Sequence, residues 1–298
     1  MPRSDGADRL RGRLGPDLAA LVADVGVPLA AASRITGLPS RLLTRATFRL
    51  DFGDGRRLKG RRLDTPDDAE RVATLAACVD APAVTRVVSR RGAALLEEWV
   101  SGVALHRRRL GEDDLRRSGA LLGAIHAAAG PAGPWTAAPP SPEQRLASAD
   151  ADLVELARLE LLVPAVVDRL REALRRHAPV RQAVGVIHRD FAPENIVVDA
   201  DGTLHVVDNE TLTVDAYDFD LARTWYRWPM TPAARQAFEA GYATVRGLDG
   251  YRAHFPFWAV AVLSEAALFR HRAQTRGQHV PLRRVGEVLA LLDRGHGP

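Results

Sequence analysis

The most informative part of the sequence reads Val186-Ile187-His188-Arg189-Asp190-Phe191-Ala192-Pro193-Glu194-Asn195-Ile196-Val197-Val198, and it continues to Val206-Val207-Asp208-Asn209-Glu210. Apolar runs on both sides of the polar loop predict short buried strands at 184–187, 196–198 and 204–207. Such strands bury their apolar side chains and leave the polar side chains together at one end of the strands. We therefore expect Asp190, Asn195 and Asp208 to converge.

These three side chains suit phosphoryl transfer. One carboxylate can accept or orient the hydroxyl proton of an acceptor, and Asp190 is the candidate. An amide and a second carboxylate, Asn195 and Asp208, can hold Mg²⁺, a hard cation that prefers oxygen ligands. The alternative is a polar hairpin loop without a function, but the joint pattern is more specific than any of its parts.

Upstream of this loop, the first hundred residues predict a small α+β unit. Residues 44–52 alternate between apolar and polar and predict a half-buried strand. Asp54-Gly55 predicts a hairpin turn, with the returning strand at 57–63. Thr65-Pro66 then opens a helix, because threonine caps a helix and proline suits its first turn.

The rest of the chain predicts mostly helices, outside the strands around the central loop. We expect a helix at 113–129, a proline-rich loop at 130–142, two helices up to about residue 177, and helices again from 217 to about 294.

The loop segment resembles the aminoglycoside phosphotransferase and choline kinase-like family, which shares the bilobal fold of protein kinases. The resemblance runs from about residue 33 to 270 and is tight only in the loop. It implies an α+β fold with a small N-terminal lobe, built from an antiparallel sheet and one main helix, and a larger helical lobe. Residues 1–100 would bind the nucleotide, about 97–102 would form the hinge, and 103–298 would carry catalysis and the acceptor.

The same resemblance implies roles for the loop residues. Asp190 would be the catalytic base, and Asn195 and Asp208 would be the Mg²⁺ ligands. His188 would brace the loop, and Asp220, in an Asp-Leu-Ala segment, would support the fold of the catalytic lobe.

Nucleotide contacts also follow from the resemblance. Lys59, the single lysine among 41 Lys and Arg residues, would bind the α- and β-phosphates and pair with Glu70 on the following helix. Backbone groups near Glu98 and Val100 would read the adenine edge, and Ser40 would contact a phosphate. The alternatives are a surface lysine, an ordinary buried strand and a loop without phosphate contacts.

Two differences from protein kinases bear on the class of substrate. Protein kinases carry a lysine two residues after the catalytic aspartate, where this chain has Ala192, and Asp208-Asn209-Glu210 stands where they have Asp-Phe-Gly. We therefore expect a small-molecule acceptor and not a protein.

Acidic and aromatic residues after the loop are candidates for the acceptor site. Glu210, Asp215 and Asp218 could bind a cationic acceptor, or they could cap helices or pair with nearby arginines. Trp225 could stack on a sugar, a base or a quaternary amine, or it could belong to the core.

The expected function is an ATP- and Mg²⁺-dependent O-phosphotransferase acting on a small-molecule hydroxyl, and nothing in the sequence separates ATP from GTP. The acceptor could be an antibiotic, such as an aminoglycoside-like compound, or a sugar or amino-alcohol metabolite. A nucleotide-binding pseudokinase is the non-enzymatic alternative.

Bulk properties exclude several other classes. The 298 residues are 46% apolar and 26% charged, as in globular proteins. A net charge of +4 argues against a nucleic-acid partner. A single cysteine fits a reducing compartment, and the polar start and the short apolar stretch at 255–269 predict neither export nor a membrane span. We expect a cytoplasmic monomer or homodimer.

Overall fold

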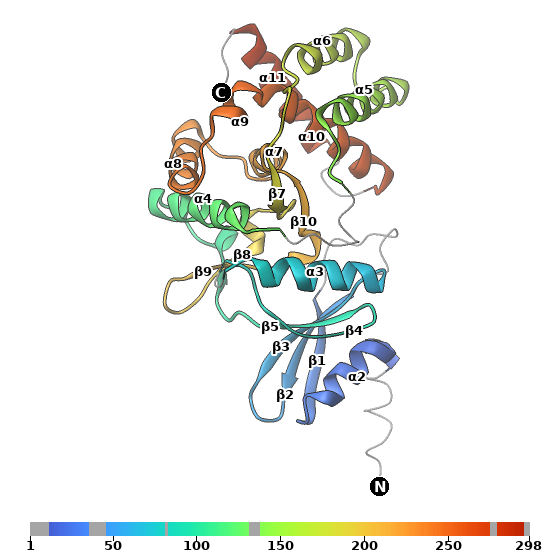
Figure 1. The fold of residues 1–298 in the computed structure, drawn as a ribbon, viewed down its shortest axis with the longest axis vertical. Coiled ribbons are helices and arrows are strands. Elements are labelled where there is room, and N and C mark those ends of the chain that lie inside the picture. The colour runs from blue at the N-terminus through green and yellow to red at the C-terminus, as the bar shows by residue number, and fades with distance from the viewer. Residues whose placement is uncertain (1–11, 36–45, 81–82, 131–137, 275–278, 295–298) are drawn as a thin grey trace.

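The computed structural model describes residues 12–35, 46–80, 83–130, 138–274 and 279–294. These residues form two lobes, a small one built around a sheet and a large one built mostly from helices (Figure 1). The predicted bilobal α+β fold is therefore confirmed. Ser40 lies outside the described residues.

The small lobe contains a five-stranded antiparallel sheet in the order β1-β2-β3-β5-β4. The second strand buries every other side chain, as its alternating sequence predicts. Gly55, with a φ of 86°, makes the turn between the second and third strands. The strands are β1 (Leu29–Ile35), β2 (Ala46–Phe52), β3 (Arg57–Arg62), β4 (Val87–Arg91) and β5 (Ala94–Glu98).

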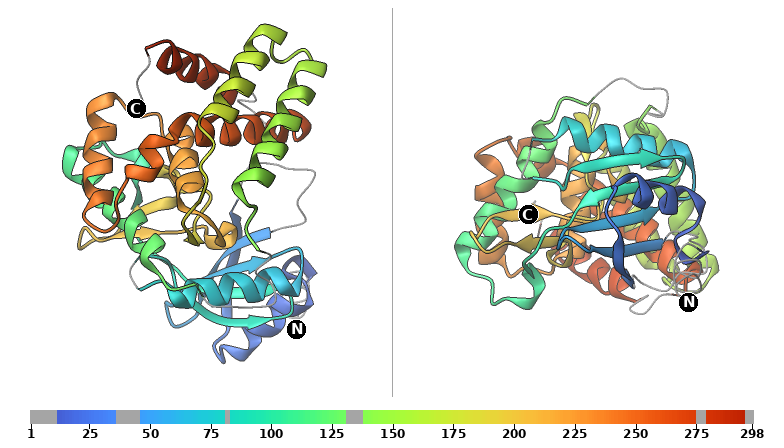
Figure 2. Two further views of the ribbon diagram at one scale, coloured as in Figure 1. Left: turned by 45° about the horizontal axis from the view of Figure 1, so that its top comes forward. Right: turned by 90° about the horizontal axis from the view of Figure 1, so that it is seen from below.

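Two helices cover the faces of this sheet, α2 (Pro16–Asp24) on the outside and α3 (Pro66–Cys78) toward the large lobe (Figures 1 and 2). The Thr65 hydroxyl caps α3 by accepting from the Asp68 N–H at 3.1 Å. A Cβ on Gly60 would lie 3.1 Å from Leu18, so this glycine lets α2 approach β3 closely.

The chain crosses between the lobes after β5. The next strand, β6 (Val103–Ala104), already pairs with β8 (Ile196–Val198) of the large lobe. A Cβ on Gly102 would lie 2.1 Å from the Val198 carbonyl oxygen. Only glycine fits at this crossing, because the chain that connects the lobes lies directly against the backbone of β8.

The large lobe is built around one helix, α10 (Phe255–Arg272), which is buried along most of its length. Its apolar first two-thirds explain why the sequence shows no amphipathic stripe here. Among the described residues, no helix is both long and apolar enough to cross a membrane. The surrounding helices are α4 (Glu112–Ala127), α5 (Pro142–Arg158), α6 (Pro164–Arg176), α7 (Tyr217–Arg227), α8 (Pro232–Ala243), α9 (Asp249–Ala253) and α11 (Val280–Asp293).

Short strands carry the central loop at the border with the small lobe. One sheet has the order β6-β8-β9 and the other pairs β10 with β7. Val84 also bridges Val206 in parallel, with the Thr85 N–H donating to the Val206 carbonyl at 3.2 Å, so the two lobes share backbone hydrogen bonds. The further strands and single turns are β7 (Val184–Ile187), β9 (Leu204–Val206), β10 (Thr213–Ala216), η1 (Leu105–Arg107), η2 (Pro193–Asn195) and η3 (Asn209–Thr211).

Candidate active site

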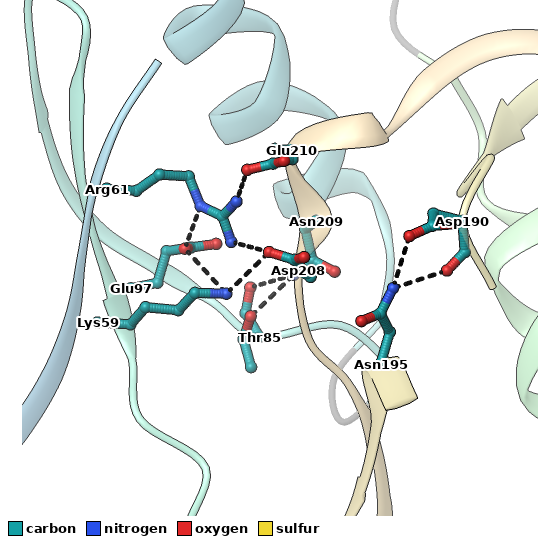
Figure 3. A network of polar contacts seen from close by, with 9 residues as sticks. All are labelled: Lys59, Arg61, Thr85, Glu97, Asp190, Asn195, Asp208, Asn209 and Glu210. Atoms are coloured by element: carbon teal, nitrogen blue, oxygen red, sulfur yellow. Dashed lines mark hydrogen bonds and ion pairs between the residues drawn. The ribbon is translucent and has the colours of Figure 1, made fainter. Parts of the chain in front are cut away.

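The loop between β7 and β8 brings Asp190 and Asn195 into contact. The Asn195 Nδ2 donates to the Asp190 Oδ2 and to the Asp190 carbonyl, both at 2.9 Å. These two bonds fix the amide, and its oxygen lies on the side that faces Asp208 (Figure 3). The loop therefore presents a carboxylate and an amide oxygen together.

Asp220, on α7, holds the backbone of this loop. Its carboxylate accepts from the N–H of His188 at 2.9 Å and of Arg189 at 2.8 Å. It also lies 3.1 Å from Nε2 of the buried His126. Arg189 has a φ of 63°, a strained backbone conformation that these bonds stabilise. These contacts fit the supporting role that the resemblance implies for Asp220.

Asp208 stands opposite, directly after β9, also with a left-handed backbone (φ 72°). Its Oδ1 lies 2.7 Å from Arg61 NH2 and 3.5 Å from Lys59 Nζ. Desolvation would raise the pKa of Asp208, but the two cations outweigh it and hold the pKa below its usual value. The carboxylate is therefore ionised at neutral pH.

Lys59 points into the space between the lobes, but its partner is not the one expected. The predicted pair with Glu70 is wrong, because Glu70 faces Arg90 at 3.8 Å. Lys59 instead lies 3.9 Å from Glu97, its directly paired neighbour on β5. A sequence indicates which residues lie on a helix, but not how that helix is rotated against the sheet.

Arg61 is a site residue that the sequence analysis missed. It is fully buried, and its guanidinium contacts Glu97, Asp208 and Glu210 (Figure 3). The sequence does contain a signal for Arg61. Side chains two residues apart on a strand share a face, and Arg61 follows Lys59 by two residues.

Arg227, at the end of α7, was also missed as a contact of the loop. Its Nε lies 2.9 Å from Asp190 Oδ1, and its NH2 donates to Glu194 at 2.6 Å. A cation next to the candidate base keeps that carboxylate in one orientation.

The residues present fit a Mg²⁺ ion. Asn195 uses its nitrogen for Asp190, which leaves the amide oxygen for a cation. Asp208 uses Oδ1 for the two basic side chains, and no hydrogen bond from a described residue reaches Oδ2. Mg²⁺ is commonly held by one or two such oxygens together with phosphates and water. No cluster of three or more His, Cys, Asp or Glu that could hold a metal ion occurs among the described residues.

A model of the phosphotransferase enzyme family matches residues 56–254, about two thirds of the chain, including every strand and loop of this site. The chain belongs to this family. A search of the curated proteins gave no match for this phosphotransferase.

Solved structures with a similar fold include kinases and antibiotic phosphotransferases. The phosphotransferase is similar to a thermostable mutant of an aminoglycoside phosphotransferase in a ternary complex with ADP and hygromycin B (TM-score 0.64, 17% identity, 94% of this chain and 98% of the other). It is also similar to a macrolide 2'-phosphotransferase from Brachybacterium faecium (TM-score 0.60, 18% identity, 89% and 96%). An ethanolamine kinase from Plasmodium vivax has a TM-score of 0.62, with 13% identity and coverage of 89% and 83%.

The acidic acceptor candidates do not form one group. Glu210 binds Arg61. Asp215 is buried, and Arg145 and the Ala216 N–H donate to it. Both carboxylates therefore contact arginines that lie far from them in the sequence.

Asp218 and Trp225 lie in the packing between helices of the large lobe. A Cβ on Gly250 would be 3.6 Å from the Asp218 carboxylate, and burial raises the pKa of Asp218 to about 6. Trp225 is buried, its ring packs edge-on against Phe255 at 5.1 Å between centroids, and the Arg284 guanidinium covers it at 4.0 Å. These contacts favour the core position, the alternative to a stacking role, for Trp225.

Near the hinge, Glu98 is exposed and its side chain pairs with Arg86. The Glu98 N–H donates to the Arg86 carbonyl at 3.0 Å, so this N–H is already used. Val100 is half-buried between β5 and β6.

A cavity of about 340 Å³ opens beside the central loop. It is bounded by α5, β10, α7 and α10, and its charged lining residues are Arg145, Asp152, Arg189, Asp215 and Glu265. Asp215 is thus the acidic candidate that lines a cavity.

Proposed function

We propose that this phosphotransferase uses ATP and Mg²⁺ to phosphorylate a hydroxyl group of a small molecule. In this proposal residues 1–100 form the nucleotide-binding lobe and 103–298 form the catalytic and acceptor-binding lobe. One observation carries it: Lys59 of one lobe reaches Asp208 of the other, while Asn195 joins Asp190 with its amide oxygen facing Asp208. The residues proposed as base, metal ligands and phosphate-binding cation therefore lie together, which supports this assignment.

Each group has a defined task in this reaction. Asp190, held by Asn195 and Arg227, orients the acceptor hydroxyl and accepts its proton. Lys59 binds phosphate oxygens and balances their charge. A bound Mg²⁺, held by Asn195 and Asp208, would neutralise the phosphates further. Such catalysis is mostly positioning and electrostatics, so each group should contribute several kcal/mol to lowering the barrier.

We propose that the acceptor enters the cavity beside Arg189 and Asp215. The lining is polar and carries both signs of charge, which suits a hydroxylated compound with an amine more than an apolar one. An antibiotic and a sugar or amino-alcohol metabolite both satisfy this description.

The test is an ADP-release screen of the purified enzyme over aminoglycosides, macrolides, sugars and amino alcohols, with ATP and with GTP. We expect turnover with at least one hydroxyl acceptor and none in excess EDTA. The matched variant is Asp190→Ala, which should fold and bind nucleotide but lose at least about 1,000-fold in kcat. Normal phosphoryl transfer by Asp190→Ala would refute the assignment.

A further inference from the structure

Arg61 stands out because a fully buried guanidinium contacts three carboxylates at once. Nε lies 3.1 Å from Glu97, NH2 lies 2.7 Å from Asp208, and NH1 contacts Glu210. A buried cation of this kind is costly unless each of its donors is paired. The three contacts run in three directions from one planar group, which a lysine ammonium cannot reproduce.

These contacts join the two lobes. Arg61 and Glu97 lie on neighbouring strands of the small lobe, whereas Asp208 and Glu210 follow β9 in the large lobe. With Lys59 included, two positive charges face three negative ones.

The backbone at Asp208 needs such support. Its φ of 72° is uncommon for a residue with a Cβ and is maintained only where the surroundings enforce it. Next to it, Asn209 Nδ2 donates to Thr85 Oγ1 at 2.8 Å, which fixes the following residue to the small lobe as well (Figure 3).

Both cations contact the same oxygen of Asp208, Oδ1. We propose that Arg61 is a positioning residue for the metal-binding carboxylate. By holding Oδ1 against the small-lobe sheet, it keeps Oδ2 directed to the cation that accompanies the nucleotide. This inference rests on the proposed function, because it assumes that a metal–nucleotide complex binds between the lobes.

The experiment measures how much a metal strengthens ADP binding. ADP affinity is determined by calorimetry in Mn²⁺ and in EDTA, for the wild type, Arg61→Lys and the double variant Arg61→Met/Glu97→Gln. The double variant avoids leaving Glu97 as a buried unpaired charge. Asp208→Asn removes the carboxylate itself and therefore shows how large a complete loss of the metal-dependent gain in ADP affinity is.

We expect both Arg61 variants to lose at least tenfold of the metal-dependent gain in ADP affinity, which is the ratio of each variant's own affinities in Mn²⁺ and in EDTA. The matched controls are Arg57→Lys and Arg57→Met, because Arg57 lies on the same strand but pairs with Asp51 inside the small lobe. Both controls should keep the full gain.

Two results would overturn the inference. One is an unchanged or larger metal-dependent gain in the Arg61 variants, and the other is an equal loss of affinity with and without metal. A wild-type protein without metal-dependent ADP binding would refute the proposed function itself. A normal wild type with an intact gain in the Arg61 variants would refute only the role of Arg61.

Discussion

Lys59 lies between two carboxylates, Glu97 and Asp208, and it is the only lysine in the chain. Burial lowers its pKa and Arg61 lowers it further, while the two carboxylates oppose both effects. A compact ammonium fits beside the Arg61 guanidinium, whereas a second guanidinium would compete for the same oxygens.

We therefore expect Lys59→Arg to lose about 100-fold in kcat/KM although the charge is kept. The measurement is steady-state kinetics with the acceptor found by the screen. Arg49→Lys serves as the control, because Arg49 is a partly exposed residue on β2 that binds Asp51. A fully active Lys59→Arg enzyme would remove Lys59 from the catalytic machinery.

Asp218 is a second residue whose effect on the free energy of unfolding can be measured. Its pKa of about 6 lies above the value of 3.8 expected when the chain is unfolded, so above pH 6 folding forces a partly desolvated carboxylate to stay charged. Asp218→Asn should raise the free energy of unfolding at pH 8 by on the order of 2 kcal/mol. Below pH 6 the gain should shrink, and near pH 4 it should vanish. Urea unfolding at pH 8 and pH 5 measures this, and equal gains at both values would contradict it.

At the scale of helices, α4 and α8 pack with backbone against backbone. A Cβ on Gly241 would lie 1.8 Å from the Arg116 carbonyl oxygen, and one on Gly119 would lie 1.9 Å from the Phe238 carbonyl oxygen. Neither neighbour is a flexible side chain that can move aside.

Gly241→Ala should therefore lower the free energy of unfolding by about 2–4 kcal/mol, because the helices must separate. The control is Gly247→Ala, where nothing lies within 4 Å of the added methyl group. Thermal unfolding of both variants measures the difference. Similar melting temperatures for the two would show that the helices adjust without cost.

The elements also show what the sequence could predict. The strands around 190–208 were predicted correctly, because apolar runs flank a loop of defined spacing. The strand at Leu29–Ile35 was missed, since it is rich in alanine and mostly exposed at the sheet edge.

Local sequence patterns likewise predicted only part of the candidate site. Asp190 and Asn195 follow from spacing along one chain segment, and Lys59 follows from the resemblance to the family. The choice of Glu97 over Glu70 depends on which strands pair and how a helix is rotated, and neither is a local property. For Trp225 the sequence left a stacking role and a core position open, because aromatic residues at helical spacing suit a core as well as a ligand site.

At the scale of the whole molecule, two buried histidines make the free energy of unfolding depend on pH. Burial lowers the pKa of His126 and of His188 below the unfolded value of about 6.5, so the folded state resists their protonation. The unfolded chain then binds more protons as the pH falls below 6.5, which favours unfolding.

We expect the free energy of unfolding to fall from pH 7.5 to pH 5.5 by about 1 kcal/mol for each histidine. Asp218 opposes this trend, so the measurement is best made in the Asp218→Asn variant. Denaturant unfolding at the two pH values gives the result. A free energy that rises toward pH 5.5 in that variant would contradict the buried neutral state of both histidines.

The cross-strand pair of Lys59 and Glu97 has a consequence for control of the enzyme. Its two members face each other on hydrogen-bonded strands, so the sheet itself sets their separation. Kinases that take the lysine's partner from a helix can be switched off when that helix swings away. Here an outward swing of α3 would leave the pair intact. Under the proposed function, Lys59 would therefore keep its partner without any movement of α3.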